Sequence, residues 1–265
     1  MTYNPFNPRN RAFTAKDVQA ILDAHDVPFH VLNSDMYQTA MVHSSYVKRT
    51  EYTLPSGERT ELAPRPSGCI GLFDTSYERL EHLGDSILGT CVSTYLMTRF
   101  PTENEGFLTD IKKEIVCNDM LGQLSLKIGL ADFYIISRHN ETTCGGRANP
   151  KKLGDILEAF IGALWTDSGN NYPVVSAFVV ALVEKHIDIP RLLMNNRNFK
   201  EQLQKIYHAR FHALPTYVLL AAPPGTFRVA VADPRGTYIG QGSGPTKKQA
   251  EQAAAEQAIK SLGSS

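Results

Sequence analysis

The sequence of 265 residues is poor in cysteine: it has four, and no two of them form a Cys-x-x-Cys pair. Isolated cysteines of this kind are typical of reduced thiols in an intracellular protein. No stretch approaches the roughly eighteen consecutive apolar residues of a membrane span, and residues 1–13 lack the apolar core of a signal peptide. We therefore expect a cytoplasmic protein that does not insert into a membrane, with a nuclear location as the alternative.

The sequence also lacks an excess of positive or negative charge, because its 27 Lys and Arg residues balance its 27 Asp and Glu residues. The balance hides an asymmetry: residues 1–195 hold 18 basic and 23 acidic residues, whereas residues 196–265 hold 9 and 4. An acidic body followed by a basic tail predicts a module that binds a polyanion, attached to a part that uses carboxylates.

Helical periodicity dominates the first two-thirds of the chain. We expect helices over 14–25, 35–46, 76–99, 108–129, 151–167 and 173–185, and no strand before residue 213. Residues 47–73 are rich in proline and glycine and predict a long surface insertion. The first domain, over 1–190, is therefore predicted to be all-α.

The tail has a different pattern after a predicted linker at 191–197. A helix over 198–211 is followed by strand candidates at 216–221, 226–231 and 237–242, and an alanine-rich helix over 247–262 closes the chain. This order predicts a small α+β domain, α-β-β-β-α, over 198–265.

Two of the predicted helices carry carboxylates on one face. Glu78, Glu81 and Asp85 stand at i, i+3 and i+7, which places them within about 60° of one another around the helix. Asp155 and Glu158 repeat the i, i+3 spacing. The opposite face of the first helix is apolar and is expected to be buried; it holds Leu80, Leu83, Ile87 and Cys91.

Clustered carboxylates at helical spacing repel one another and destabilise a helix. Oxygen-ligated cations such as Mg²⁺ remove this repulsion, and two of them can activate water and stabilise the leaving oxygen of a phosphodiester. Gly84, Gly154 and Gly162 keep bulk away from the carboxylates. From spacing alone, two solvated helix faces remain the alternative to a metal centre.

At these residues the sequence resembles the ribonuclease III family. Residues 77–88 (YERLEHLGDSIL) resemble the family signature, and residues 154–169 (GDILEAFIGALWTDSG) resemble its second acidic motif. Residues 105–109 and 38–46 are similar to its Glu-Gly segment and its upstream Thr-His-Ser-Tyr element. The resemblance implies an endoribonuclease that cleaves double-stranded RNA by two-metal-ion hydrolysis. The expected products carry 5′-phosphate and 3′-hydroxyl ends with a short 3′ overhang.

The resemblance also implies roles for single residues. The metal ligands would be Glu81, Asp85, Asp155 and Glu158, with Mg²⁺ as the cofactor and Mn²⁺ able to substitute. The residues expected to take part in catalysis are Glu78, Asp85, Glu105, Lys151 and Glu158. Lys151 lies where Dicer-like members carry a lysine near the scissile phosphate, and Lys152 is the alternative.

By the same resemblance, two catalytic domains form one valley for duplex RNA, so a single catalytic domain implies a homodimer. His82 stands where family members often have an aromatic residue at the dimer seam, which predicts a packing role. The insertion at 47–73 departs from the compact bacterial pattern and favours a eukaryotic or large-DNA-virus origin.

Residues 196–263 resemble a double-stranded RNA-binding domain. The predicted RNA contacts are Lys200, Gln204, Thr246, Lys247 and Lys248. Thr246 can cap the last helix, whose N-terminal N–H groups then face phosphate together with the two lysines that follow. The loop at 221–226 is short and lacks the Gly-Pro-x-His element of such domains, which predicts weaker binding by this module.

The competing hypothesis is a non-catalytic protein that sequesters duplex RNA. A homologue that has lost activity is expected to lose one or more of the metal-binding carboxylates, and here all four are present. The sequence therefore favours the enzyme.

Overall fold

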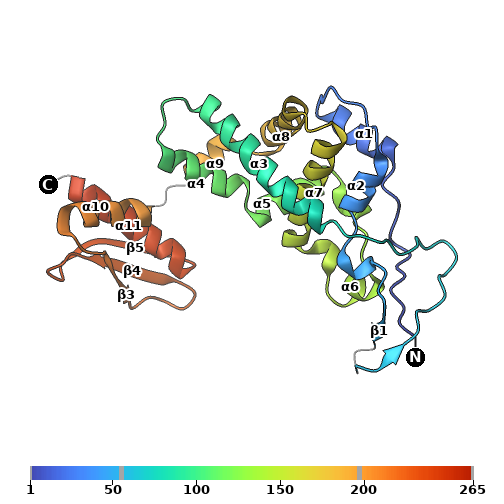
Figure 1. Ribbon diagram of the computed structural model, residues 1–265. Helices are drawn as coiled ribbons and strands as arrows, with labels where there is room; N and C mark the ends of the chain where they lie inside the picture. Colours follow the sequence, from blue (N-terminus) through green and yellow to red (C-terminus); the bar gives the residue numbers. More distant parts are fainter. Residues whose placement is uncertain (1, 54–56, 196–198, 264–265) are drawn as a thin grey trace. The chain divides into compact units, whose positions relative to one another are not determined.

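The computed structural model describes residues 2–53, 57–195 and 199–263 (Figure 1). The chain divides into two compact units, Met1–Leu192 and Leu193–Ser265. No helix in the described ranges is both long and apolar enough to cross a bilayer.

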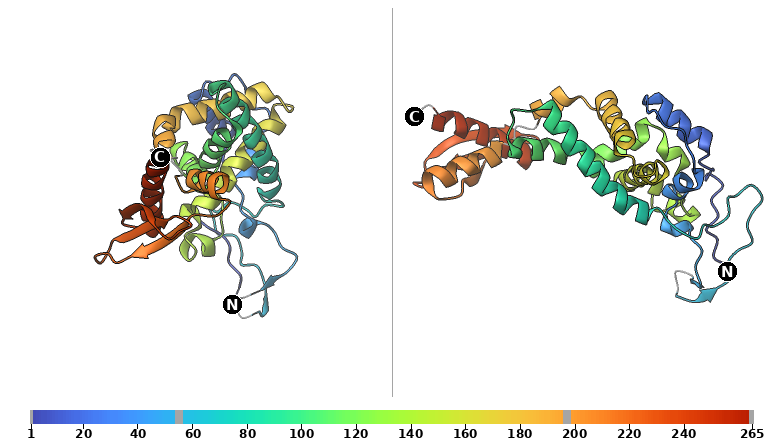
Figure 2. Two further views of the ribbon diagram at one scale, coloured as in Figure 1. Left: turned by 90° about the vertical axis from the view of Figure 1, so that its left-hand side faces the viewer. Right: turned by 45° about the horizontal axis from the view of Figure 1, so that its top comes forward.

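The first unit is helical and is arranged around α7. Its helices are α1 (Ala15–Ala24), α2 (Ser34–Ala40), α3 (Glu78–Arg99), α4 (Glu105–Ile115), α5 (Asn118–Lys127), α6 (Arg138–Thr142), α7 (Pro150–Asp167), α8 (Tyr172–His186) and α9 (Ile189–Asn195). Helix α7 packs against α2, α3, α5 and α8 (Figures 1 and 2). It is buried along most of its length, and two of its carboxylates, Asp155 and Asp167, lie inside the unit.

Local sequence explains where these helices begin. The side chain of Thr14 accepts a hydrogen bond from the backbone N–H of Asp17, and the Asp17 carboxylate accepts one from the backbone N–H of Thr14. This reciprocal pair is the capping box that starts α1. Asn149 caps α7, and Pro150 occupies its first turn, where a missing N–H is not a disadvantage.

Two expected helices are shorter than predicted. The helix predicted over 35–46 ends at Ala40, because Val42 is drawn into a parallel bridge with Ile135. The helix predicted over 108–129 is two helices, since Cys117 adopts an extended conformation between α4 and α5. In both places a tertiary contact or a break in the backbone overrides a continuous helical pattern.

The described residues of the insertion at 47–73 belong to the first unit and pack on it. The insertion contains the short antiparallel strands β1 (Tyr52–Thr53) and β2 (Arg59–Thr60), so the expectation of no strand before residue 213 is wrong in this detail. Its apolar residues pack on a buried cluster of Phe6, Val42, Tyr46 and Ile135; they include Val47, Leu62, Ile70, Leu72 and Phe73. Residues 54–56 lie outside the described ranges.

The N-terminal segment is fastened to the same region. The backbone of Tyr3 exchanges hydrogen bonds with Glu61 and Ala63 of the insertion. The buried side chains of Asn7 and Asn10 both donate to the carbonyl of Ile136. Residues 3–10 are thus joined both to the insertion and to the segment that precedes α6.

The predicted linker at 191–197 is helical as far as Asn195, the end of α9. The rest of that prediction, and the predicted helix start at residue 198, lie outside the described residues. Helix α10 (Phe199–Phe211) then opens the second unit.

The second unit has the predicted order α-β-β-β-α. Strands β3 (Thr216–Leu220), β4 (Phe227–Ala232) and β5 (Tyr238–Gly244) form an antiparallel sheet in sequence order, and α11 (Lys247–Gly263) ends the chain. Helices α10 and α11 cover one face of this sheet (Figure 1). A Cβ at Gly242 would lie 2.2 Å from the backbone N of Ala254. The small residues of the glycine-rich strand β5 and the alanine-rich helix α11 therefore let the two backbones pack in close contact.

The contact that positions the carboxylates is the crossing of α3 over α7. A Cβ at Gly84 would lie 1.7 Å from the backbone oxygen of Glu158, and a Cβ at Gly162 would lie 2.2 Å from that of Leu80. The two helices therefore approach backbone to backbone, which only glycine permits at these positions.

We expect Gly84→Ala to destabilise the protein by about 1–3 kcal/mol or more, because the added methyl group forces α3 and α7 apart. Gly89→Ala is the matched control on the same helix, since its Cβ would meet only the flexible end of Lys112 at 3.4 Å. That control should be neutral or more stable, because alanine favours a helix over glycine. Chemical denaturation of both variants measures the difference; equal stability would contradict a crossing that requires glycine.

Candidate active site and RNA-binding face

Three of the predicted carboxylates converge at the crossing of α3 and α7. Oxygen atoms of Glu81, Asp155 and Glu158 all lie within 4.8 Å of one another. Asp155 is buried, and the other two are partly exposed. Carboxylate oxygens at this separation, with one side open to solvent, fit the ligands of a hard divalent cation.

Negative charge accumulates around Glu158 in this cluster. Burial, followed by the charges of Asp85 and Glu81, raises the pKa of Glu158 to about 8. Burial and Asp155 also raise the pKa of Glu81. Asp85 is exposed on α3 next to this group. Upward shifts of this kind mean that ionising the cluster is unfavourable until a cation compensates it.

Two further residues hold Asp155. The hydroxyl of Tyr77 donates to Asp155 Oδ2 at 3.0 Å, and the ammonium of Lys152 donates to the same oxygen at 2.9 Å. Lys152 Nζ also lies 3.2 Å from the Tyr77 oxygen. Sequence reasoning missed Tyr77, although it stands immediately before the signature carboxylates; only its burial reveals the role.

The remaining predicted catalytic residues lie around or away from the cluster. Lys151 is exposed, and its charge acts on Glu81 only through space. Glu78 is exposed in the first turn of α3 and also acts on Glu81 through its charge. Glu105 begins α4 and accepts a hydrogen bond from Thr109; among the described residues it is not part of the converging group.

The upstream segment that contains His43 supports Tyr77. The His43 ring lies 6.0 Å from the Tyr77 ring and 6.1 Å from the Tyr134 ring, and its Nδ1 is 2.9 Å from Ser45 Oγ. Burial, followed by the nearby charge of Lys152, lowers the pKa of His43. A neutral, packed imidazole fits a supporting role better than proton transfer.

The predicted RNA contacts of the second unit lie on α10 and α11. Lys200, Gln204 and Lys248 line one surface hollow of about 610 Å³. Thr246 Oγ1 accepts the backbone N–H of Gln249 at 3.3 Å and so caps α11, with Lys247 exposed beside it. The cap and the lysines together offer phosphate a helix N-terminus and positive charge.

The Lys200 ammonium is already engaged within this surface. It lies 2.5 Å from a carboxylate oxygen of Glu251, whose side chain is only 14% exposed, and 4.9 Å from the centre of the Tyr217 ring. Lys247 lies at 4.0 Å from the other oxygen of Glu251. Phosphate must therefore compete with a resident carboxylate for these lysines.

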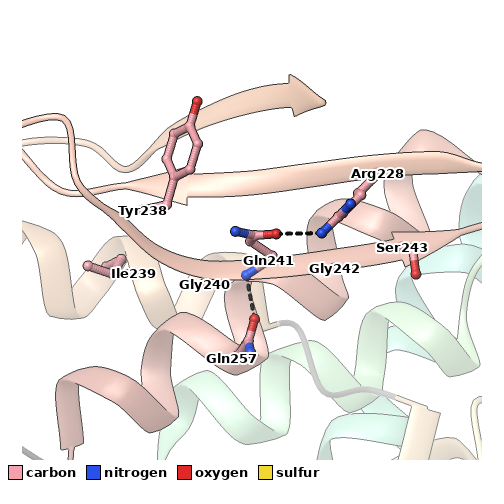
Figure 3. A pocket seen from close by; sticks show the side chains of 8 residues that line it. All are labelled: Arg228, Tyr238, Ile239, Gly240, Gln241, Gly242, Ser243 and Gln257. Carbon is pink, nitrogen blue, oxygen red and sulfur yellow. Dashed lines mark hydrogen bonds between the residues drawn. The ribbon is translucent and has the colours of Figure 1, made fainter. Parts of the chain in front are cut away.

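A second hollow of the same unit lies along β5 (Figure 3). Arg228 donates to the Gln241 side chain at 3.0 Å, and the Gln257 side-chain oxygen accepts the backbone N–H of Gln241 at 2.5 Å. No carboxylate lines this hollow. The hollow lies beside the edge strand β5, and its lining residues are not those of a cation site.

Comparison with known proteins agrees with this arrangement. Residues 78–169 match the Ribonuclease III domain family, and residues 199–262 match the double-stranded RNA binding motif. The chain is 33% identical over 240 residues to Ribonuclease 3 of Staphylococcus aureus (strain bovine RF122 / ET3-1), covering 89% of each chain. It is 39% identical over 188 residues to Ribonuclease 3 of Syntrophotalea carbinolica, covering 70% of this chain and 80% of that one.

A solved structure supports the fold of the first unit. The crystal structure of the nuclease domain of ribonuclease III from Campylobacter jejuni matches with a TM-score of 0.50 at 24% identity, covering 65% of this chain and 97% of that one.

A helical unit that gathers carboxylates, followed by a small sheet covered by two helices, defines a nuclease body with a nucleic-acid-binding module. The identity to the Staphylococcus aureus enzyme over most of both chains is decisive. The chain belongs to the ribonuclease III family. It is an endoribonuclease of that family with a C-terminal double-stranded RNA-binding domain.

Glu158 should make the stability of the metal-free protein depend on pH. Its pKa in the folded state is about 8, above the ordinary value of 4.5. The protonated Glu158 carboxyl group therefore contributes to the free energy of unfolding. This contribution is fully present below the unfolded-state pKa and is lost as the pH rises through the folded-state pKa. In EDTA, we expect the Tm to fall between about pH 5 and pH 8.

Glu158→Gln should remove that fall and raise the Tm at the alkaline end, by about 2–4 °C for each kcal/mol of repulsion removed. Glu114→Gln, an exposed carboxylate on α4, is the control and should leave the pH dependence unchanged. A slope that persists in Glu158→Gln would show that another group is responsible.

The lysines at the start of α11 should contribute to RNA affinity through phosphate. We expect the double variant Lys247→Met/Lys248→Met to bind a perfect RNA duplex more weakly, and the salt dependence of log K to decrease by about one for each lysine. Lys260→Met, near the other end of the same helix, should have no effect on either quantity. Fluorescence anisotropy at several salt concentrations measures both; an unchanged salt dependence would exclude these contacts.

Proposed function

We propose that the protein hydrolyses phosphodiester bonds in duplex RNA with two divalent cations, Mg²⁺ with Mn²⁺ able to substitute. The products would carry 5′-phosphate and 3′-hydroxyl ends and short 3′ overhangs. The observation that carries this proposal is the convergence of the Glu81, Asp155 and Glu158 oxygens within 4.8 Å. The pKa of Glu158, which burial and the neighbouring carboxylates raise to about 8, supports a divalent cation as a further partner of this group.

Each residue has a part in this reaction. Glu81, Asp85, Asp155 and Glu158 would hold the cations. When bound, these ions supply a reactive water and neutralise charge on the phosphate. Tyr77 fixes the Asp155 carboxylate from its buried side, so that this carboxylate is oriented before substrate arrives.

Lys151 and Lys152 place positive charge at the start of α7, next to the carboxylate cluster. Lys151 is exposed in the first helical turn, where the backbone N–H groups also favour an anion. We assign it the attraction of the scissile phosphate. Glu78 and Glu105 would shape the site around a cation or a water.

Cutting both strands of a duplex requires two such centres, and the catalytic domain here carries one. We propose that two copies of the chain associate through α3. This helix exposes Leu83 and Met97, at 37% and 64%. Leu83 was expected to be buried within the single chain, and its exposure fits a residue that is covered by a partner. His82, also exposed, would pack in the same seam.

The decisive experiment is incubation of the purified protein with a labelled perfect RNA duplex, in Mg²⁺ or in EDTA. We expect cleavage that requires Mg²⁺, spares single strands and leaves 5′-phosphates. Glu158→Gln should abolish cleavage and keep duplex binding, because it removes a cation ligand without touching the RNA-binding domain.

Glu114→Gln, the exposed control on α4, should cleave like the wild type. Tight binding of duplex RNA by the wild type without cleavage, under conditions in which a family member cleaves, would instead support a protein that sequesters duplexes.

A further inference from the structure

Lys152 stands at an unusual place for a cation. It is the third residue of α7, and its backbone N–H donates to the cap residue Asn149. Positive charge in the first turn of a helix is disfavoured by the helix dipole. The compensation comes from its side chain, which turns back onto Asp155 with the ammonium 2.9 Å from Oδ2. A strong local attraction therefore keeps Lys152 in the site.

This ion pair is largely removed from solvent. The Asp155 side chain is 4% exposed and that of Lys152 is 35% exposed. A buried carboxylate without a partner is strongly destabilising, and partial burial weakens screening by water and salt. Removing the Lys152 charge should therefore cost more stability than removing one partner of a surface ion pair, which is worth little.

The two donors to Asp155 approach the same oxygen. Tyr77 and Lys152 both donate to Oδ2, and no residue of the described ranges donates to Oδ1. The Tyr77 ring is 1% exposed and lies 6.0 Å and 6.4 Å from the rings of His43 and Tyr134. The hydroxyl therefore has little freedom, and it fixes which oxygen of Asp155 remains available to a further ligand.

We propose that Lys152 is a resident counter-ion of the metal centre that lowers its affinity for divalent cations. In the metal-free protein its ammonium neutralises Asp155. When a cation binds, the same positive charge opposes it at short range, so the affinity of the centre is set below what its carboxylates alone would give. This inference rests on the proposed metal-dependent function and makes Lys152 a positioning residue, distinct in role from Lys151.

The test replaces Lys152 by methionine, which keeps most of the length of the side chain and removes its charge. Two quantities are measured on the full-length protein: the Kd for Mn²⁺ without RNA, by calorimetry, and the Tm in EDTA. We expect Mn²⁺ to bind about tenfold more tightly, since a nearby unit charge is removed in a partly screened site. We expect the Tm in EDTA to fall by about 2–4 °C, because Asp155 loses its partner.

Lys151→Met is the matched control, because it makes the same change of charge one residue away on an exposed side chain. It should change the Mn²⁺ affinity and the Tm much less. Lys152→Arg keeps the charge and should retain the wild-type Kd. Unchanged or weaker Mn²⁺ binding by Lys152→Met, or equal effects of the two methionine variants, would overturn the proposal.

Glu158→Gln separates this inference from the proposed function. If the wild type binds no Mn²⁺, or if Glu158→Gln leaves the Mn²⁺ affinity unchanged, the metal centre itself is disproved, and Lys152 with it. If Glu158→Gln weakens binding while Lys152→Met does not strengthen it, the metal centre stands and only the counter-ion role fails.

Discussion

The backbone contact between α3 and α7 is the constraint on which the rest of the first unit depends. Gly84 and Gly162 let the two helices approach so closely that each glycine faces a carbonyl of the other helix. Side chains that leave each helix near this point must therefore meet. Because Asp155 and Glu158 lie one turn apart on α7 and Glu81 lies one turn before Gly84, the crossing converts two separate acidic stripes into one group.

Burying a carboxylate inside a protein is unfavourable unless its charge is compensated, and in both units a lysine supplies the compensation. In the first unit the Lys152 ammonium balances the buried Asp155. In the second, Lys200 balances the largely buried Glu251 within the predicted RNA-binding face. Each pair joins a group expected to act on a ligand to an internal partner of opposite sign. A ligand at either site would therefore meet a pair whose charges already compensate each other.

Much of this was predictable from local pattern, and the exceptions have physical causes. Helical spacing identified the acidic faces, and the order of elements identified the second unit. Tyr77 was not found in this way, and Lys152 was named only as the alternative to Lys151, since the roles of both depend on which atoms meet after two helices cross. Leu83 followed the apolar face of its helix in the sequence but is 37% exposed, because periodicity cannot say whether that face is covered by the same chain. The break between α4 and α5 at Cys117 could not be predicted either, because neither proline nor glycine occurs there.

The way in which the N-terminal segment is fastened has a consequence for folding during synthesis. Tyr3 bonds to Glu61 and Ala63, and Asn7 and Asn10 bond to the carbonyl of Ile136. Residues 3–10 thus have partners that are synthesised much later, and such long-range contacts form slowly. The segment cannot reach its native place until more than half of the chain has emerged. Until then the apolar cluster of Phe6, Val42 and Tyr46 lacks Ile135 and stays open to solvent, so transient exposure of apolar surface during synthesis is concentrated in this region.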